Sequence, residues 1–264
     1  IRLLDPTDGK IIFDGKDITN LKSKVSLRKE MQIIFQDPFS SLNPRMSVSQ
    51  IIEEPLIIHK MCKNKAELES RVHELMDTVG LAIRLEDSYP HELDGGRRQR
   101  IGIARALALN PKFIVCDEPV SALDVSIQAQ ILNLMMDLQE KHNFTYIFIT
   151  HDLSVVKHIS DEIMVMYLGV VVEKCKADEL FEHTLHPYSK ALLSVIPEPT
   201  IKKKKERKLI QGEITSPINP KPGCRFAARC SYARDICHQV TPALKEISPG
   251  HFVSCHFVNE INSL

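Results

Sequence analysis

Short runs of consecutive apolar residues, separated by segments with helical periodicity, organise the first two thirds of the chain. Apolar residues spaced by three and four predict amphipathic helices over 65–79 and 126–142. Strands that are apolar throughout and alternate with helices are typical of a parallel sheet covered on both faces. The pattern therefore predicts an α/β fold. The predicted strands cover residues 31–35, 113–116, 146–149, 164–166 and 170–172.

The pattern changes after about residue 195. A Pro-Glu-Pro step and a run of lysines follow, which is the composition of a solvated linker. The last part of the chain is rich in loops and holds four of the seven cysteines. We therefore predict a domain at 1–195, a basic linker at 196–208 and a small C-terminal extension at 209–264.

Composition and charge limit the classes of protein that fit. The chain of 264 residues has 34 basic and 34 acidic residues, so its formal net charge is zero. This balance argues against a protein that binds nucleic acid through bulk charge. Hydrophobic residues make up 43% and charged residues 26%, which are ordinary globular values and exclude disordered and fibrous classes. No apolar run approaches the roughly 18 residues of a membrane span.

Two carboxylates directly follow the apolar run at 113–116. Asp117 and Glu118 stand at the C-terminal end of this predicted strand, the edge at which open α/β sheets bind their ligands. A carboxylate at Asp117 can hold Mg²⁺, and Glu118 is placed to polarise an attacking water. Taken alone, the pair also fits two solvated carboxylates in a turn.

Other polar residues stand at comparable positions. Gln36 follows the strand predicted at 31–35, and His151 follows the strand predicted at 146–149. A buried core histidine fits His151 less well, because it comes after a buried strand at the ligand edge. Asp94-Gly95-Gly96-Arg97 opens a predicted helix, where free backbone N–H groups and the helix dipole favour an anion.

In chain order, these segments resemble the glutamine loop, signature motif, Walker B strand, D-loop and switch histidine of the ATP-binding cassette (ABC) ATPases. The D-loop match is Ser121-Ala122-Leu123-Asp124. The resemblance implies a P-loop NTPase-type parallel sheet, a helical subdomain at about 37–105, and ATP with Mg²⁺ as ligands.

The resemblance also implies roles for single residues. Glu118 is expected to be the general base, Asp117 to help hold Mg²⁺, and Gln36 to contact Mg²⁺ or the attacking water. His151 is expected to contact the γ-phosphate. Asp124 is expected at the interface between two nucleotide-binding domains, and the segment from Asp94 to Arg97 at the nucleotide.

The sequence departs from the family in two places. It lacks the phosphate-binding loop G-x-x-x-x-G-K-[ST], so we expect that loop to precede Ile1 in a longer protein, and residues 1–264 alone to be inactive. The usual signature Leu-Ser-Gly-Gly-Gln is replaced by Leu93-Asp94-Gly95-Gly96-Arg97. An aspartate accepts hydrogen bonds but cannot donate one to a phosphate. We therefore expect Asp94 either to act only as a helix N-cap or to slow ATP hydrolysis at the site that this signature completes.

The tail narrows the resemblance further. His186-Pro187-Tyr188 and the later cysteines resemble the C-terminal extension of oligopeptide, dipeptide and nickel importer ATPases. The implied partners are a second ABC ATPase subunit, two transmembrane permease subunits and, indirectly, an extracytoplasmic peptide-binding protein. The implied location is the cytoplasmic face of the cell membrane, as a peripheral protein. A soluble ABC ATPase, a nickel or opine importer ATPase and a non-enzymatic interaction module remain alternatives.

The four tail cysteines are the remaining candidates for chemistry. Cys224, Cys230, Cys237 and Cys255 are spaced C-x5-C-x6-C-x17-C. Four thiolates can ligate a [4Fe–4S] cluster or Zn²⁺, and a small loop-rich segment needs such a staple. The resemblance favours iron–sulfur, while zinc and four unrelated thiols stay open.

Overall fold

The computed structural model describes residues 1–21, 25–196, 212, 216 and 218–263. The chain forms two compact units, Ile1–His151 and Asp152–Leu264. Of the linker predicted at 196–208, all but the first residue lies outside the described residues. The division predicted at residues 195 and 209 stays a prediction.

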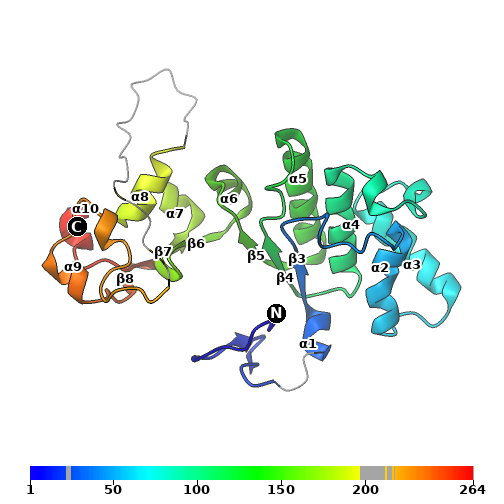
Figure 1. Cartoon of the computed structure of the whole chain (residues 1–264), viewed down its shortest axis with the longest axis horizontal. Coiled ribbons are helices and arrows are strands. Elements are labelled where there is room, and N and C mark those ends of the chain that lie inside the picture. Colours follow the sequence, from blue (N-terminus) through cyan, green and yellow to red (C-terminus); the bar gives the residue numbers. More distant parts are fainter. Residues whose placement is uncertain (22–24, 197–211, 213–215, 217, 264) are drawn as a thin grey trace. The chain divides into compact units, whose positions relative to one another are not determined.

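A parallel sheet forms the centre of the Ile1–His151 unit (Figure 1). Its strand order is β3 (Met31–Ile34), β4 (Phe113–Asp117) and β5 (Thr145–Ile149), and both pairs are parallel. The middle strand fully buries Ile114 and Cys116. The predicted parallel α/β architecture is therefore confirmed, with each strand within about one residue of its predicted bounds.

Among the helices of this unit, α4 connects the largest number of other elements. It contacts α2, α3, α5 and β3, and it buries apolar residues along most of its length. The helices of this unit are α1 (Val25–Glu30), α2 (Val48–Ile58), α3 (Lys65–Thr78), α4 (Gly95–Leu107) and α5 (Val125–His142), with short 3-10 turns η1 (Ile83–Leu85) and η2 (Pro90–Glu92).

The edges of this unit are less completely covered. On β5, Ile147 and Ile149 are about half exposed, so the expected burial of the sheet on both faces is not met at this strand.

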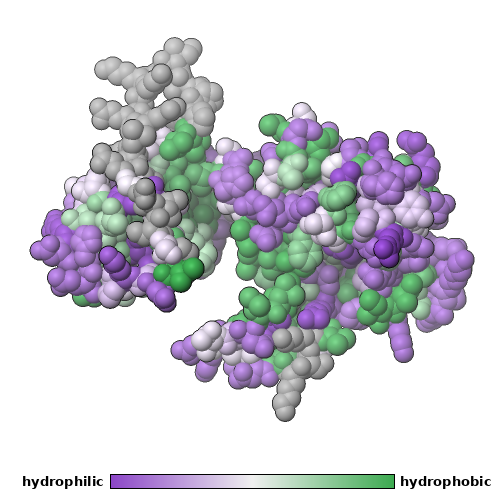
Figure 2. All heavy atoms as spheres, viewed as in Figure 1, coloured by the Kyte–Doolittle hydropathy of each residue, from purple (hydrophilic) through white to green (hydrophobic). Residues whose placement is uncertain are grey.

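A two-stranded antiparallel hairpin, β1 (Ile12–Phe13) and β2 (Lys16–Asp17), turns at Asp14-Gly15. Hydrophilic residues cover much of the visible surface of the helical part, with hydrophobic residues in patches (Figure 2).

The Asp152–Leu264 unit is built on an antiparallel sheet. Its order is β6 (Glu162–Tyr167), β7 (Val170–Lys176), β9 (His251–Val253) and β8 (Lys245–Ser248). Leu168-Gly169 joins the first two strands with both residues at positive φ, as a tight hairpin turn requires. Strand β9 thus pairs with β7, about 80 positions earlier in sequence, and β8 joins the sheet through β9. The tail therefore shares one sheet with β6 and β7.

An aromatic cluster joins this sheet to the segments around it. The rings of Tyr167 and Phe226 meet edge to face at 5.3 Å, and Tyr188 lies 4.7 Å from Tyr167. Tyr188 belongs to the His-Pro-Tyr segment and Phe226 to the cysteine-containing tail. The helical elements of this unit are α6 (Leu153–Ile159), α7 (Ala177–Glu182), α8 (Pro187–Leu193), η3 (Ala227–Arg229), α9 (Asp235–Gln239) and α10 (Val258–Asn262). None of the helices within the described ranges combines the length and the hydropathy that crossing a membrane requires.

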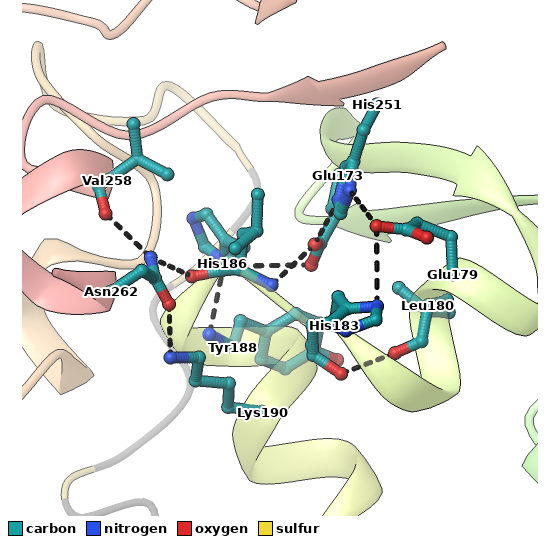
Figure 3. Close-up of polar contacts among 12 residues, drawn as sticks. Glu173, Glu179, Leu180, His183, His186, Tyr188, Lys190, His251, Val258 and Asn262 are labelled. Atoms are coloured by element: carbon teal, nitrogen blue, oxygen red, sulfur yellow. Dashed lines mark hydrogen bonds and ion pairs between the residues drawn. The ribbon is translucent and has the colours of Figure 1, made fainter. Parts of the chain in front are cut away.

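A buried glutamate anchors the His-Pro-Tyr segment (Figure 3). Glu173 on β7 is 0% exposed. Its carboxylate accepts hydrogen bonds from the backbone N–H groups of Leu185 (2.7 Å) and His186 (3.1 Å). The Nε2 atom of His251 on β9 lies 2.8 Å from the same carboxylate. One side chain therefore holds the start of α8 against the sheet.

The contacts of His251 continue toward the surface. Its Nδ1 atom has no hydrogen-bond partner within the described residues, and it lies 3.7 Å from Oε1 of Glu179. That oxygen is in turn 3.6 Å from Nδ1 of the exposed His183 (Figure 3). His186 itself is buried, which lowers its pKa to about 4. The ring is therefore neutral, and its Nδ1 accepts the N–H of Tyr188 at 3.1 Å.

Candidate functional site

Three of the predicted catalytic side chains meet at the carboxyl edge of the parallel sheet. Gln36 follows β3, Glu118 follows β4 and His151 follows β5. The amide Nε2 of Gln36 donates to Oε2 of Glu118 at 2.9 Å, and Nδ1 of His151 lies 3.1 Å from Oε1 of Glu118. The parallel order of the strands brings these residues together, because parallel strands end at the same edge.

The backbone at Glu118 holds this carboxylate in place. Glu118 has φ +43°, a left-handed conformation that costs energy for a residue other than glycine and is typical of functional sites. Its N–H donates to the carbonyl of Ile149 at 2.9 Å, which ties the turn to the end of β5. The hydroxyl of Ser121 donates to the Glu118 carbonyl at 3.1 Å.

The electrostatic surroundings favour the ionised form of Glu118. A hydrogen bond from His151 lowers the pKa of this carboxyl, with smaller contributions from Ser121 and Gln36. The group is therefore a carboxylate at neutral pH, which is the form that a general base requires.

Of the two predicted Mg²⁺ ligands, Gln36 belongs to this cluster and Asp117 directly precedes Glu118. Asp117 is the last residue of β4 and is partly buried. Across the described ranges, no group of three or more histidine, cysteine or acidic side chains is arranged to hold a metal ion. Mg²⁺ is usually held by one or two carboxylates together with substrate phosphates, so Asp117 and Gln36 remain predicted ligands.

The signature segment, which we define as Leu93–Arg97, starts helix α4. Asp94 is the N-cap residue, and its Oδ1 accepts the backbone N–H of Arg97 at 2.8 Å. Gly95 lies against the D-loop, where a Cβ would come within 3.0 Å of Leu123. Gly96 lies against α5, where a Cβ would come within 2.7 Å of Ile127. Close packing, besides access to an anion, therefore requires a glycine at Gly96.

The D-loop has a support that sequence reasoning missed. Asp124 caps α5 by accepting the N–H of Ile127 at 3.0 Å. Gln128, one helical turn later, donates from Nε2 to the carbonyls of Val120 (2.9 Å) and Leu123 (3.1 Å). A polar residue four positions after the cap was the only signal in the sequence, and it does not reveal where the side chain folds back.

The segment after Gln36 contacts α4, the helix that the signature segment begins. The guanidinium of Arg98 stacks on the ring of Phe39 at 5.2 Å. Arg105, further along α4, donates to the carbonyl of Ser41 at 2.7 Å. These two contacts join the loop that follows Gln36 to helix α4, which the signature segment begins.

The four tail cysteines come together, although they are far apart in sequence. Cys224, Cys230, Cys237 and Cys255 line one small cavity, and none forms a disulfide. Burial raises the pKa of Cys230 to about 11 and also raises those of Cys224 and Cys255. The donor set suits a soft metal, but none of the groups within the described ranges has metal-holding geometry. The predicted iron–sulfur or zinc site is therefore not confirmed.

Comparison with protein families gives two matches along the chain. The ABC transporter family matches residues 1–121. The family described as "Oligopeptide/dipeptide transporter, C-terminal region" matches residues 172–237. The second match contains the His-Pro-Tyr segment, Glu173 and three of the four tail cysteines.

Curated relatives match almost the whole chain. The oligopeptide transport ATP-binding protein AppF of Bacillus subtilis is 54% identical over 262 residues, which cover 97% of this chain and 79% of AppF. The oligopeptide transport ATP-binding protein OppF of Salmonella typhimurium is 51% identical, over 97% of this chain and 77% of OppF.

Solved structures show the same fold. CbiO1 from Clostridium perfringens, part of the ABC transporter complex cbiONQ, matches with a TM-score of 0.62 and 31% identity, over 69% of this chain and 71% of that chain. The ATP-binding cassette MJ0796, in a post-hydrolysis state with ADP and Pi, matches with a TM-score of 0.58 and 30% identity, over 66% of this chain and 76% of that chain. Together with the sheet-edge geometry, these similarities show that the chain belongs to the ABC transporter ATPases, in the group of oligopeptide transport ATP-binding proteins.

Proposed function

We propose that this chain belongs to the ATP-hydrolysing subunit that energises peptide import through an ABC transporter. The observation that carries the proposal is the meeting of Gln36, Glu118 and His151 at the sheet edge, in a chain whose tail matches the oligopeptide transporter C-terminal region. The first feature supports nucleotide hydrolysis, and the second supports peptides as the cargo class.

Each side chain has a chemical role in this proposal. The Glu118 carboxylate accepts a proton from the water that attacks the γ-phosphate. His151 and Gln36 hold that carboxylate from either side and contact the γ-phosphate and the water, respectively. Asp117 and Gln36 would hold Mg²⁺, which when bound neutralises phosphate charge. The signature segment and Asp124 face a nucleotide held by a second ATPase subunit.

The proposed partners follow from the same family. They are a second ABC ATPase subunit, two transmembrane permease subunits and, indirectly, an extracytoplasmic peptide-binding protein, with this chain at the cytoplasmic face of the membrane. Exposed apolar side chains at Phe39, Ile57 and Ile58 support docking on the permeases. Arg98 and Arg105 would pass a displacement at that surface to the signature segment.

Transport by the assembled complex tests the proposal. In vesicles that contain the permease subunits and both ATPase subunits, with the binding protein outside, we expect ATP inside to drive uptake of a labelled oligopeptide. Uptake of nickel or an opine without any uptake of peptide would contradict the peptide assignment. ATP hydrolysis without binding to permeases would point to a soluble ABC ATPase instead.

We further propose that the four tail cysteines hold a [4Fe–4S] cluster, with Zn²⁺ as the alternative metal. Their gathering around one cavity supports a shared ligand. Burial favours the neutral thiols in the absence of metal, and binding of a metal would displace their protons. In this proposal the cluster stabilises the loop-rich C-terminal extension by linking its four cysteines.

Metal analysis after anaerobic purification tests this site. We expect about four irons per chain, because four cysteines ligate one [4Fe–4S] cluster. The Cys230→Ser variant should lose the iron and the brown colour, whereas Cys62→Ser, which changes a cysteine of the other unit, should keep both. Zinc without iron would overturn the cluster in favour of zinc, and a chain without any metal would leave four free thiols.

A further inference from the structure

The N-cap carboxylate of the signature segment is already engaged within its own helix. Oδ1 of Asp94 accepts the N–H of Arg97 at 2.8 Å, and Oδ2 lies 3.4 Å from the Arg97 guanidinium. Both side chains remain accessible, with 60% of Asp94 and 48% of Arg97 exposed. The negative charge therefore stands at the open start of α4 and is only partly balanced by a solvated cation.

The start of α4 is where an anion from another molecule would bind. The N–H groups of the first turn lack partners within the helix, and the helix dipole adds positive potential there. Asp94 places a carboxylate in this position and uses the N–H of Arg97. An incoming phosphate would meet a like charge and would find one of these donors taken.

The helix start cannot move aside easily to relieve this conflict. A Cβ at Gly96 would clash with Ile127 at 2.7 Å, and one at Gly95 would be in tight contact with Leu123 at 3.0 Å. Leu123 is itself held by Gln128, which donates to its carbonyl at 3.1 Å. These contacts restrict the backbone at the start of α4, and the hydrogen bond from the Arg97 N–H orients the Asp94 carboxylate.

We propose that Asp94 acts as a built-in competitor of the γ-phosphate, so that the ATP site completed by this signature segment closes weakly and turns over slowly. The inference rests on the proposed function, because it needs a nucleotide presented by a second subunit. If that subunit carries a serine at the equivalent position, the two ATP sites of the transporter are unequal.

Arg97 has the opposite effect in this proposal. Its guanidinium lies 3.4 Å from Oδ2 of Asp94 and partly balances that negative charge. Removing Arg97 alone should therefore weaken ATP-driven closure, and removing Asp94 alone should strengthen it. A plain capping role for Asp94 does not predict opposite effects of these two changes.

The test compares Asp94→Asn and Asp94→Ser with the unchanged protein in the complete transporter. Aspartate, asparagine and serine cap helices about equally well, so α4 stays formed while the charge is removed. We expect both variants to bind a non-hydrolysable ATP analogue at this site about tenfold more tightly, as loss of one partly screened like-charge contact predicts. The gain should shrink at high salt, and Arg97→Gln should lower the affinity.

Equal affinity and turnover in the unchanged protein, Asp94→Asn and Asp94→Ser would overturn this inference and leave Asp94 as a cap only. The failure of the proposed function would look different. In that case no variant would hydrolyse ATP in response to peptide, whereas the analogue affinities would still show whether the charge at Asp94 opposes nucleotide.

Discussion

Replacing Glu118 with glutamine should lower ATP turnover in the assembled transporter by about 10²–10⁴-fold, the usual contribution of a general base. Glutamine keeps the size of the side chain and can still contact Gln36 and His151, but it cannot accept the proton of the attacking water. ATP binding should therefore be retained. Turnover and bound nucleotide, measured on the same preparation, separate the two effects.

A carboxylate far from the sheet edge provides the control for this change. Glu69 on α3 forms an exposed pair with Lys65 at 3.5 Å, and Glu69→Gln should leave turnover unchanged. Turnover of Glu118→Gln within a few-fold of the unchanged protein would show that Glu118 is not the base. A loss of ATP binding would instead assign Glu118 to the binding of nucleotide or metal.

Removing the carboxylate of Glu173 should destabilise the Asp152–Leu264 unit by at least about 3 kcal/mol, because three buried groups lose their hydrogen-bond partner at about 1–3 kcal/mol each. Glu173→Ala leaves His251 and the N–H groups of Leu185 and His186 without their acceptor in a site that water does not reach. Glu173→Gln keeps an acceptor oxygen and should cost less, about 1–3 kcal/mol.

Hydrogen exchange of the full chain measures this effect within each unit. The amides of β7 and β9 should lose protection in Glu173→Ala, while those of β3, β4 and β5 serve as an internal reference. The matched control is Glu162→Gln on β6, which removes an exposed pair with Lys174 at 3.2 Å and should change stability by less than about 1 kcal/mol. Equal loss of protection in Glu173→Ala and Glu162→Gln would show that the buried network adds no stability.

Local sequence was enough to predict the parallel sheet and the residues at its edge. Apolar runs about five residues long, each followed by a polar residue, predicted β3, β4 and β5 and placed Gln36, Glu118 and His151 at one edge. Sequence also predicted the capping role of Asp94 as one of two alternatives, because aspartate before a helix is a strong local signal. These features depend on neighbouring residues or on a regular strand order.

The burial of Glu173 could not be predicted in the same way. Glu173 directly follows the strand predicted at 170–172, and glutamate is rarely fully buried. Its burial depends on His251, 78 positions later, and on two N–H groups from another segment. The half-exposed face of β5 was missed for the converse reason, since an apolar run indicates burial but does not supply the element that covers it.

The sequence by itself therefore determined the family, the strands of the parallel sheet and the chemical identity of the site residues, because periodicity and motif spacing are local properties of the chain. Only the tertiary structure decided that Glu118 lies between Gln36 and His151, that the tail joins the sheet of β6 and β7, and that the four tail cysteines share one cavity. Each of these depends on contacts between residues far apart in sequence, which form only when strands pair and side chains pack, and which no local pattern encodes.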